Sequence, residues 1–120
     1  MKQVKELKKG KTMKSIGLPH AAANAVFTHF ATRKNILNNS TYIDFEMVNG
    51  NQDAILLVTP NLNPQGAMGI LSSHPIGVWY DTNKKRWAII NEDKSVMREG
   101  LAFNVYATTH ENPLGYSRRN

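Results

Sequence analysis

Residues 74–91 contain the pattern that most restricts the fold of this chain. Two short apolar and aromatic runs flank a polar segment, residues 81–86, whose composition is typical of a turn. Both tryptophans of the chain, Trp79 and Trp87, lie in these runs. Aromatic and β-branched residues on either side of a turn are typical of a β-hairpin. Because similar runs recur over residues 25–107, the sequence predicts an all-β domain.

Six such runs, separated by turn-forming residues, are expected to be strands: residues 25–31, 41–47, 54–59, 76–81, 87–91 and 101–107. Alternation in 41–47 predicts one buried and one wet face, whereas 54–59 is apolar on both faces and predicts a central, fully covered strand. No connection has room for a crossover helix. The expected fold is a single small, mostly antiparallel β-sandwich or barrel of about six strands, with a short helical turn over residues 92–98.

The positive charge of the chain is concentrated at its beginning. Residues 1–14 hold six lysines and one acid, whereas the other 106 residues hold nine basic and eight acidic side chains, for a total net charge of +6. A chain of 120 residues suits one domain. We therefore expect a flexible basic leader over residues 1–24, the all-β domain over 25–107 and a flexible tail over 108–120.

Composition excludes several classes of protein. The chain has no cysteine, which rules out disulfides, zinc-thiolate sites and thiol catalysis. No apolar run approaches the roughly 20 residues needed to span a bilayer. The basic leader is followed by no apolar stretch of about 7–15 residues, so no signal peptide is recognised and the cytoplasm is the favoured compartment, although the compartment stays open. No pattern bears on the oligomeric state.

The residue types that metal and acid–base chemistry require are present without the spacing that would bring them together. The candidates are His29, Asp44, His74, Asp81 and Asp93, and no H-x-H or H-E-x-x-H motif links them. Ser72 and Ser73 precede His74, but a hydrolase would also need a cleft joining a histidine to a carboxylate and a nucleophile. No phosphate-binding glycine loop is present either. We therefore predict no metal, no cofactor and no catalytic residue.

Polar and aromatic residues at the strand ends and in the hairpin are the better candidates for a binding site. They are Asn61, Asn63, His74, Trp79, Tyr80, Trp87, Asn91 and Asp93. An indole ring can stack on a sugar, and asparagine and aspartate supply directional hydrogen bonds. These residues favour a non-catalytic binding or adhesion module for a lectin-like carbohydrate ligand or a protein partner. The competing interpretation is that the indoles fill the core and the asparagines hold loops to strands.

A nucleic-acid-associated protein is the alternative from another class, and a small hydrolase is a third. The basic side chains that would serve nucleic acid lie in the leader and at the hairpin tip: Lys5, Lys8, Lys9, Lys11, Lys84, Lys85 and Arg86. The salt dependence of binding distinguishes the nucleic-acid hypothesis from the carbohydrate hypothesis. Binding to phosphates weakens steeply as the salt concentration rises, whereas binding to a neutral sugar does not.

An ordered series of motifs over residues 26–106 resembles an uncharacterised bacterial family of small domains. The motifs are H-x-A-T at 29–32, N-x-N-P at 61–64, H-P-I-G-V-W-Y at 74–80, W-A-I-x-N-x-D at 87–93 and A-F-N-V at 102–105. The order of the series is more specific than any single motif. The resemblance implies one compact domain, assigns no activity to it and leaves the lysine-rich leader outside the family.

Overall fold

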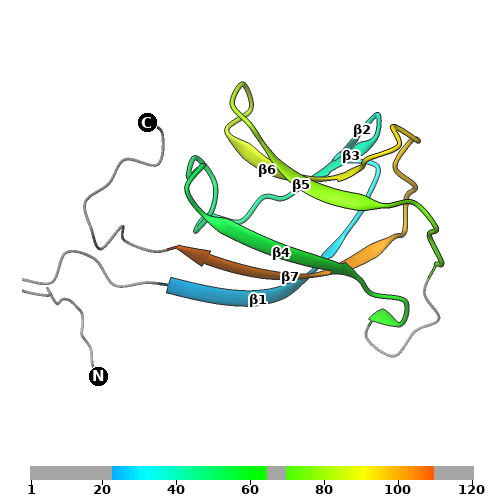
Figure 1. Cartoon of the computed structure of the whole chain (residues 1–120), viewed down its shortest axis with the longest axis horizontal. Helices are drawn as coiled ribbons and strands as arrows, with labels where there is room; N and C mark the ends of the chain where they lie inside the picture. Colours follow the sequence, from blue (N-terminus) through cyan, green and yellow to red (C-terminus); the bar gives the residue numbers. More distant parts are fainter. Residues whose placement is uncertain (1–22, 65–69, 110–120) are drawn as a thin grey trace, which may run out of the picture. The chain divides into compact units, whose positions relative to one another are not determined.

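A computed structural model describes residues 23–64 and 70–109, which form two antiparallel sheets facing each other (Figure 1). The strands of these residues are β1 (Ala23–Phe30), β2 (Ile36–Leu37), β3 (Ser40–Tyr42), β4 (Ile55–Pro60), β5 (Ile76–Asp81), β6 (Arg86–Asn91) and β7 (Ala102–Thr109). One sheet has the order β1-β7-β4 and the other the order β2-β3-β6-β5. The predicted all-β, antiparallel, sandwich-like fold is confirmed. In the described part of the chain, no helix has the length and apolar character needed to span a membrane.

The core lies between the sheets, and their inner strands β6 and β7 supply much of it. In β7, Phe103 and Val105 are fully buried, whereas Asn104 and Tyr106 point away. In β6, Ile89 is fully buried in the same cluster of apolar side chains. Because side chains alternate along a strand, this arrangement gives each sheet one dry and one outer face. The orientation expected from the sequence for residues 101–107 is therefore confirmed.

The predicted hairpin is present, and its register is regular. β5 pairs with β6 over six residue pairs, from Ile76 opposite Asn91 to Asp81 opposite Arg86. The turn is held by the Asp81 carboxylate, whose Oδ1 accepts the backbone N–H groups of Asn83 and Lys84 at 2.9 and 3.1 Å. An aspartate at this position closes the turn through its own side chain.

The strand predicted over 41–47 is much shorter than expected. β3 ends at Tyr42, and the backbone then turns, with the N–H of Val48 donating to the carbonyl of Phe45. The predicted alternation of burial nevertheless continues beyond the strand, with inward side chains at Ile43, Phe45 and Met47 and exposed ones at Asp44 and Glu46. The alternation therefore identifies which side chains reach the core, although the backbone has left the sheet.

The prediction that residues 54–59 form a central, fully covered strand is wrong. β4 is an edge strand that pairs only with β7 within the described residues. Leu56 is 5% exposed and faces the core, whereas the neighbouring Leu57 is 61% exposed and faces outward. No described element covers the outer face of this sheet, so apolar residues there stay exposed. Pro60 at the end of β4 fits an edge position, because proline cannot donate to a ladder.

The helical turn predicted over residues 92–98 does not form, because polar side chains bind the backbone there. The Asn91 side-chain amide donates to the carbonyl of Ser95 at 3.0 Å, and Asp93 Oδ1 accepts the Ser95 N–H at 3.0 Å. Lys94 takes a positive φ of 70°, which a right-handed helix does not permit. Local bonds of this kind compete with the helix.

The first and last strands of the fold lie side by side. The Thr108 hydroxyl donates to Asn24 Oδ1 at 2.6 Å at one end of the pair. At the other end, the N–H of Ala31 donates to the carbonyl of Leu101 at 2.8 Å. The strands extend two residues beyond each predicted domain boundary, to 23 and 109. Residues 1–22 and 110–120 of the predicted leader and tail lie outside the described residues.

A buried chain of polar side chains connects the two sheets through His29. The Thr41 hydroxyl donates to Asn35 Oδ1 at 2.6 Å, so it must accept the hydrogen bond that joins it to His29 Nε2 at 2.8 Å. The Nε2 atom of His29 therefore carries a proton and donates to Thr41. Burial lowers the pKa of His29 from 6.5 to about 4, because the charged imidazolium would lose its hydration.

Two adjacent leucines provide a direct test of which face of β4 is buried. Leu56→Ala should lower the free energy of unfolding by about 2–5 kcal/mol, because it leaves a cavity in the core. Leu57→Ala should lower it by less than about 1 kcal/mol, because that side chain is already in water. Urea denaturation measures both values. Equal losses, or a larger loss for Leu57→Ala, would show that β4 has the opposite face inside.

The lowered pKa of His29 predicts that the folded chain loses stability in mild acid. Because its pKa is lower in the folded chain than in the unfolded chain, the unfolded chain binds more protons between pH 6.5 and 4. The contribution of neutral His29 is complete above pH 6.5 and is lost as the pH falls to about 4, by about 3 kcal/mol in total.

Urea denaturation between pH 7 and pH 4 measures this loss. His29→Gln should remove most of the pH dependence, whereas the matched control His74→Gln should keep it. A His29→Gln variant that loses as much stability in acid as the unaltered chain would contradict the assignment to His29.

Candidate functional site

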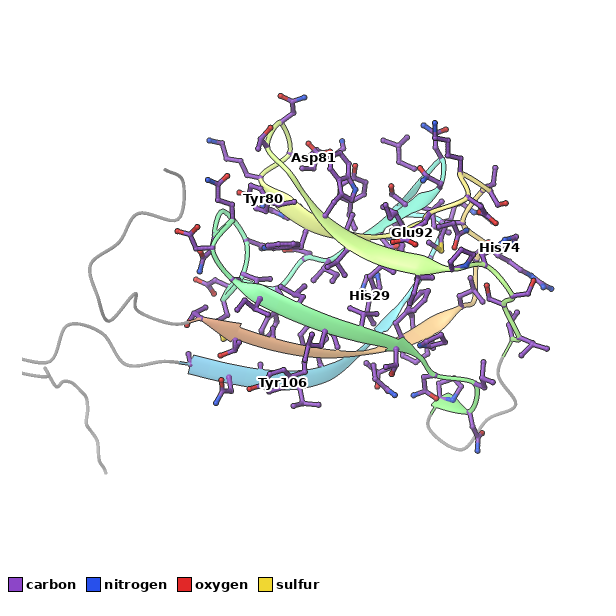
Figure 2. The ribbon with its side chains drawn as sticks, in the orientation of Figure 1. His29, His74, Tyr80, Asp81, Glu92 and Tyr106 are labelled. Carbon is purple, nitrogen blue, oxygen red and sulfur yellow. The ribbon has the colours of Figure 1, made fainter. Side chains whose placement is uncertain are left out.

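A polar pocket of about 330 Å³ lies between the segment that precedes β5 and the segment that follows β6. We call it the His74 pocket, and its lining residues are Leu71, Ser72, Ser73, His74, Asn91, Val96, Arg98 and Leu101. Figure 2 shows His74 at the start of β5, at one end of the sandwich. The volume is at the small end of the range for ligand pockets.

Asn91 occupies its place in the pocket because several backbone groups hold it. Its backbone N–H donates to the carbonyl of Asn39 at 2.9 Å, and the Asn39 side-chain amide donates back to the carbonyl of Asn91 at 2.9 Å. The side-chain amide of Asn91 donates to the carbonyls of Ser95 and Val96, at 3.0 and 3.4 Å. These bonds hold the segment after β6 and determine the orientation of the Asn91 side chain.

The other atom of that side chain, Asn91 Oδ1, has no hydrogen-bond partner among the described residues. Asn91 is only 1% exposed, so bulk water does not reach most of the residue. Buried polar atoms in native proteins almost always have a partner, and one without a partner destabilises the fold by about 1–3 kcal/mol. Because less than 1 Å² of the surface of Oδ1 is accessible, this atom is an unsatisfied acceptor inside the fold and not an open contact for a ligand.

His74 is held in one orientation by Asp93. Its Nδ1 lies 2.7 Å from Asp93 Oδ2, which leaves Nε2 as the ring nitrogen available to a ligand. The backbone N–H of Ser95 and the hydrogen bond from His74 hold the pKa of Asp93 below its usual value. Asp93 is therefore ionised at neutral pH and orients the imidazole from outside the pocket lining.

The pocket contains serines, a histidine and a nearby carboxylate, but it does not arrange them as a nucleophilic relay. Ser72 Oγ accepts the backbone N–H of His74 at 3.4 Å. Over residues 23–64 and 70–109, no hydroxyl is hydrogen-bonded to the His74 ring, as a serine nucleophile and its base would be. In the same residues, no three histidine or acidic side chains are grouped as metal ligands.

The two tryptophans have different environments. Trp87 is 9% exposed, donates its Nε1–H to the carbonyl of Asn51 at 2.9 Å and meets the Tyr80 ring edge to face at 5.5 Å. Trp79 is 43% exposed on the outer face of β5. Trp87 and Tyr80 therefore pack within the core region, and of the two indoles Trp79 is the one that presents a ring to solvent.

The structure brings three of the eight predicted site residues together: His74, Asn91 and Asp93. Asn61 lies elsewhere, where its amide donates to Asn104 Oδ1 at 2.9 Å and its Oδ1 accepts the backbone N–H of Asn63 at 2.9 Å. These bonds hold a loop next to the other sheet. Arg98 lines the pocket but was not predicted, because the sequence placed it in a helical turn that does not form.

A second concave site, of about 280 Å³, lies beside the β5–β6 hairpin. We call it the basic groove, and its lining residues are Lys34, Asn35, Ile36, Leu37, Tyr42, Lys84 and Arg86. Lys84 and Arg86 were predicted as contacts for nucleic acid, and Lys85 adjoins them in the hairpin turn. The predicted contacts Lys5, Lys8, Lys9 and Lys11 lie outside the described residues.

Tyr42 and Asp81 form a neutral–ionic pair at the wall of the basic groove. The Tyr42 hydroxyl donates to Asp81 Oδ2 at 2.7 Å. Burial and this bond raise the pKa of Tyr42 to about 12, and the same bond, with the backbone N–H groups of the turn, lowers the pKa of Asp81. Tyr42 is therefore a protonated donor. The ionised Asp81 carboxylate is stabilised by hydrogen bonds from the Tyr42 hydroxyl and from the backbone of the turn.

Comparison with known proteins gives one family. A family model described as a domain of unknown function (DUF7452) matches residues 6–107. No curated protein and no solved structure matches the chain. The matched range contains all residues of the His74 pocket and of the basic groove. It also begins before Val26, so part of the lysine-rich leader falls within the match, contrary to the expectation that the leader lies outside the family.

Acrylamide quenching of fluorescence should distinguish the two indoles. In a Trp87→Phe variant the remaining Trp79 should be quenched readily, because its ring contacts solvent. In a Trp79→Phe variant the remaining Trp87 should be largely protected, because its ring is buried and its N–H is bonded to the backbone. Stern–Volmer slopes measure both, and similar slopes in two folded variants would contradict the core position of Trp87.

Proposed function

This chain belongs to the DUF7452 family of domains of unknown function, and from its geometry we propose that it is a non-catalytic binding module. The proposed ligand is a polyhydroxylated, carbohydrate-type compound, and the proposed site is the His74 pocket. The proposal rests mainly on two polar side chains of this pocket: His74, which Asp93 holds through Nδ1 so that Nε2 remains for a ligand, and Arg98, which has no acidic partner among the described residues. Both side chains can hydrogen-bond to the hydroxyls of such a ligand.

The chemistry of the pocket lining agrees with this ligand class. Ser72 and Ser73 carry hydroxyls that can both donate and accept, as sugar hydroxyls do. His74 offers Nε2 in an orientation set by Asp93. Arg98 lines the pocket with donors and has no acidic partner among the described residues.

Apolar side chains at the same pocket provide the second element of sugar recognition. Leu71 and Val96 are largely exposed although they are apolar. The carbon–hydrogen face of a sugar ring can cover such side chains, while its hydroxyls bond to the polar lining. A pocket of about 330 Å³ suits one ring of an oligosaccharide better than a large ligand.

The His74–Asp93 contact also favours a second candidate, a small hydrolase, because a histidine oriented by a carboxylate is the base of many such enzymes. Ser72 or Ser73 would have to reach His74 Nε2 when the ligand is bound. Release of product from model esters, abolished by Ser72→Ala or Ser73→Ala, would favour this candidate over the binding module.

Glycan-array screening followed by calorimetry tests the binding module. At least one carbohydrate should bind without salt dependence, and the single variants His74→Gln and Arg98→Gln should each weaken that binding about tenfold or more, since each removes a polar contact. Lys94→Gln, on the same segment but outside the pocket lining, is the matched control and should change it by less than about twofold.

Absence of binding to any glycan at millimolar concentrations would overturn the proposal. Binding that survives both pocket variants and is lost in Trp79→Ala would move the ligand to the exposed indole of β5 and would equally overturn the assignment to the His74 pocket.

A further inference from the structure

The charged side chains of the described residues are unevenly distributed. Residues 23–64 and 70–109 hold seven lysines and arginines and seven acidic residues, so this part of the protein is neutral as a whole. Five of the seven cations nevertheless fall in two short segments, 33–34 and 84–86. The structure brings these segments together, because Lys34, Lys84 and Arg86 line the basic groove.

The acidic groups nearest these cations neutralise them only in part. Asp81, which accepts hydrogen bonds from the Tyr42 hydroxyl and two backbone N–H groups of the turn, also attracts Lys84 and offsets part of one positive charge. Asp44 lies 3.8 Å from Arg86 Nε and is 84% exposed, so this ion pair is long and well hydrated and contributes little. Lys34 has no acidic partner among the described residues. The groove therefore retains positive charge that a polyanion can neutralise.

The groove also has an apolar component. Leu37 is an exposed leucine on the edge strand β2, and Ile36 beside it is half-buried. The Tyr42 ring lies under Lys84, whose Nζ is 5.5 Å from the ring centre. Inorganic polyphosphate makes no use of such a surface, whereas a nucleic-acid base has a planar face that packs against apolar and aromatic side chains.

From these observations we propose that the basic groove binds single-stranded nucleic acid. Lys34, Lys84 and Arg86 contact its phosphates, and a base packs against Leu37 at the edge of the Tyr42 ring. Arg33 and Lys85, which adjoin the lining residues in sequence, supply charge for the neighbouring phosphates. A groove of about 280 Å³ holds one nucleotide unit of a longer strand. This site is separate from the His74 pocket and does not depend on the function proposed for it.

The test uses the full chain and a fluorescein-labelled oligo(dT) of eight nucleotides, with binding followed by fluorescence anisotropy. The double variant Lys34→Gln/Arg86→Gln should weaken binding tenfold or more. The matched control Lys94→Gln/Arg98→Gln removes the same two charge types outside the groove and should weaken it no more than about twofold. The slope of log affinity against log salt should decrease by about 1.4 in the groove variant, because two phosphate contacts are lost.

Leu37→Ser tests the base contact separately from the charge. It should weaken oligo(dT) binding about fivefold or more, the effect expected when one base loses its packing surface. It should leave binding of inorganic polyphosphate unchanged, because that polymer has no base. Circular dichroism confirms that each variant keeps the β-sheet spectrum.

Several results would overturn the proposal. Equal losses in the groove and control double variants would show that only net charge matters. Polyphosphate or a heparin oligosaccharide that binds as tightly as oligo(dT), with no effect of Leu37→Ser, would make the groove a general polyanion site. Binding that is lost when Lys5, Lys8, Lys9 and Lys11 are replaced by glutamine, but survives the groove variant, would assign it to the leader.

Discussion

The rest of the structure depends on the removal of apolar side chains from water between β6 and β7. These strands are inner strands of the two sheets, and their inward side chains meet in a single cluster. Burial of apolar surface is the dominant favourable contribution to folding. The backbone N–H and C=O groups that are buried with it find hydrogen-bond partners in the ladders between strands. Because the inner faces of both sheets are buried in this contact, the polar side chains of the candidate site lie in the segments at the strand ends.

Much of the fold could be predicted because period-2 alternation reports burial directly. β7 shows this most clearly, since its inward and outward side chains are those that the alternation predicts. The same signal misplaced β4, because an apolar face is encoded in the same way whether a second layer covers it or it remains exposed at an edge. The segment after β6 was misassigned for another reason: bonds from Asn91 and Asp93 to the local backbone compete with a helix, and spacing alone does not reveal them.

The candidate site could be predicted only in part. His74, Asn91 and Asp93 follow from their position at strand ends, since β5 and β6 are adjacent and antiparallel and the start of one lies at the end of the other. Arg98 could not be found, because its position depends on the irregular path of the backbone after Asn91. The two tryptophans are equivalent in sequence, and their different roles follow from the pairing of β5 with β6 and from the bond between Trp87 and Asn51.

The bond between Asn24 and Thr108 has a consequence for how such a unit is attached to other polypeptide. It brings the first residues of β1 and the last residues of β7 together at one end of the sandwich. At the other end of the same two strands, Ala31 is hydrogen-bonded to Leu101, and Leu101 lines the His74 pocket. Seven residues of extended chain separate the two ends by about 23 Å. A unit joined through both ends to a neighbour, or inserted into a host loop, is thus anchored at its base and carries its pocket at the distal tip.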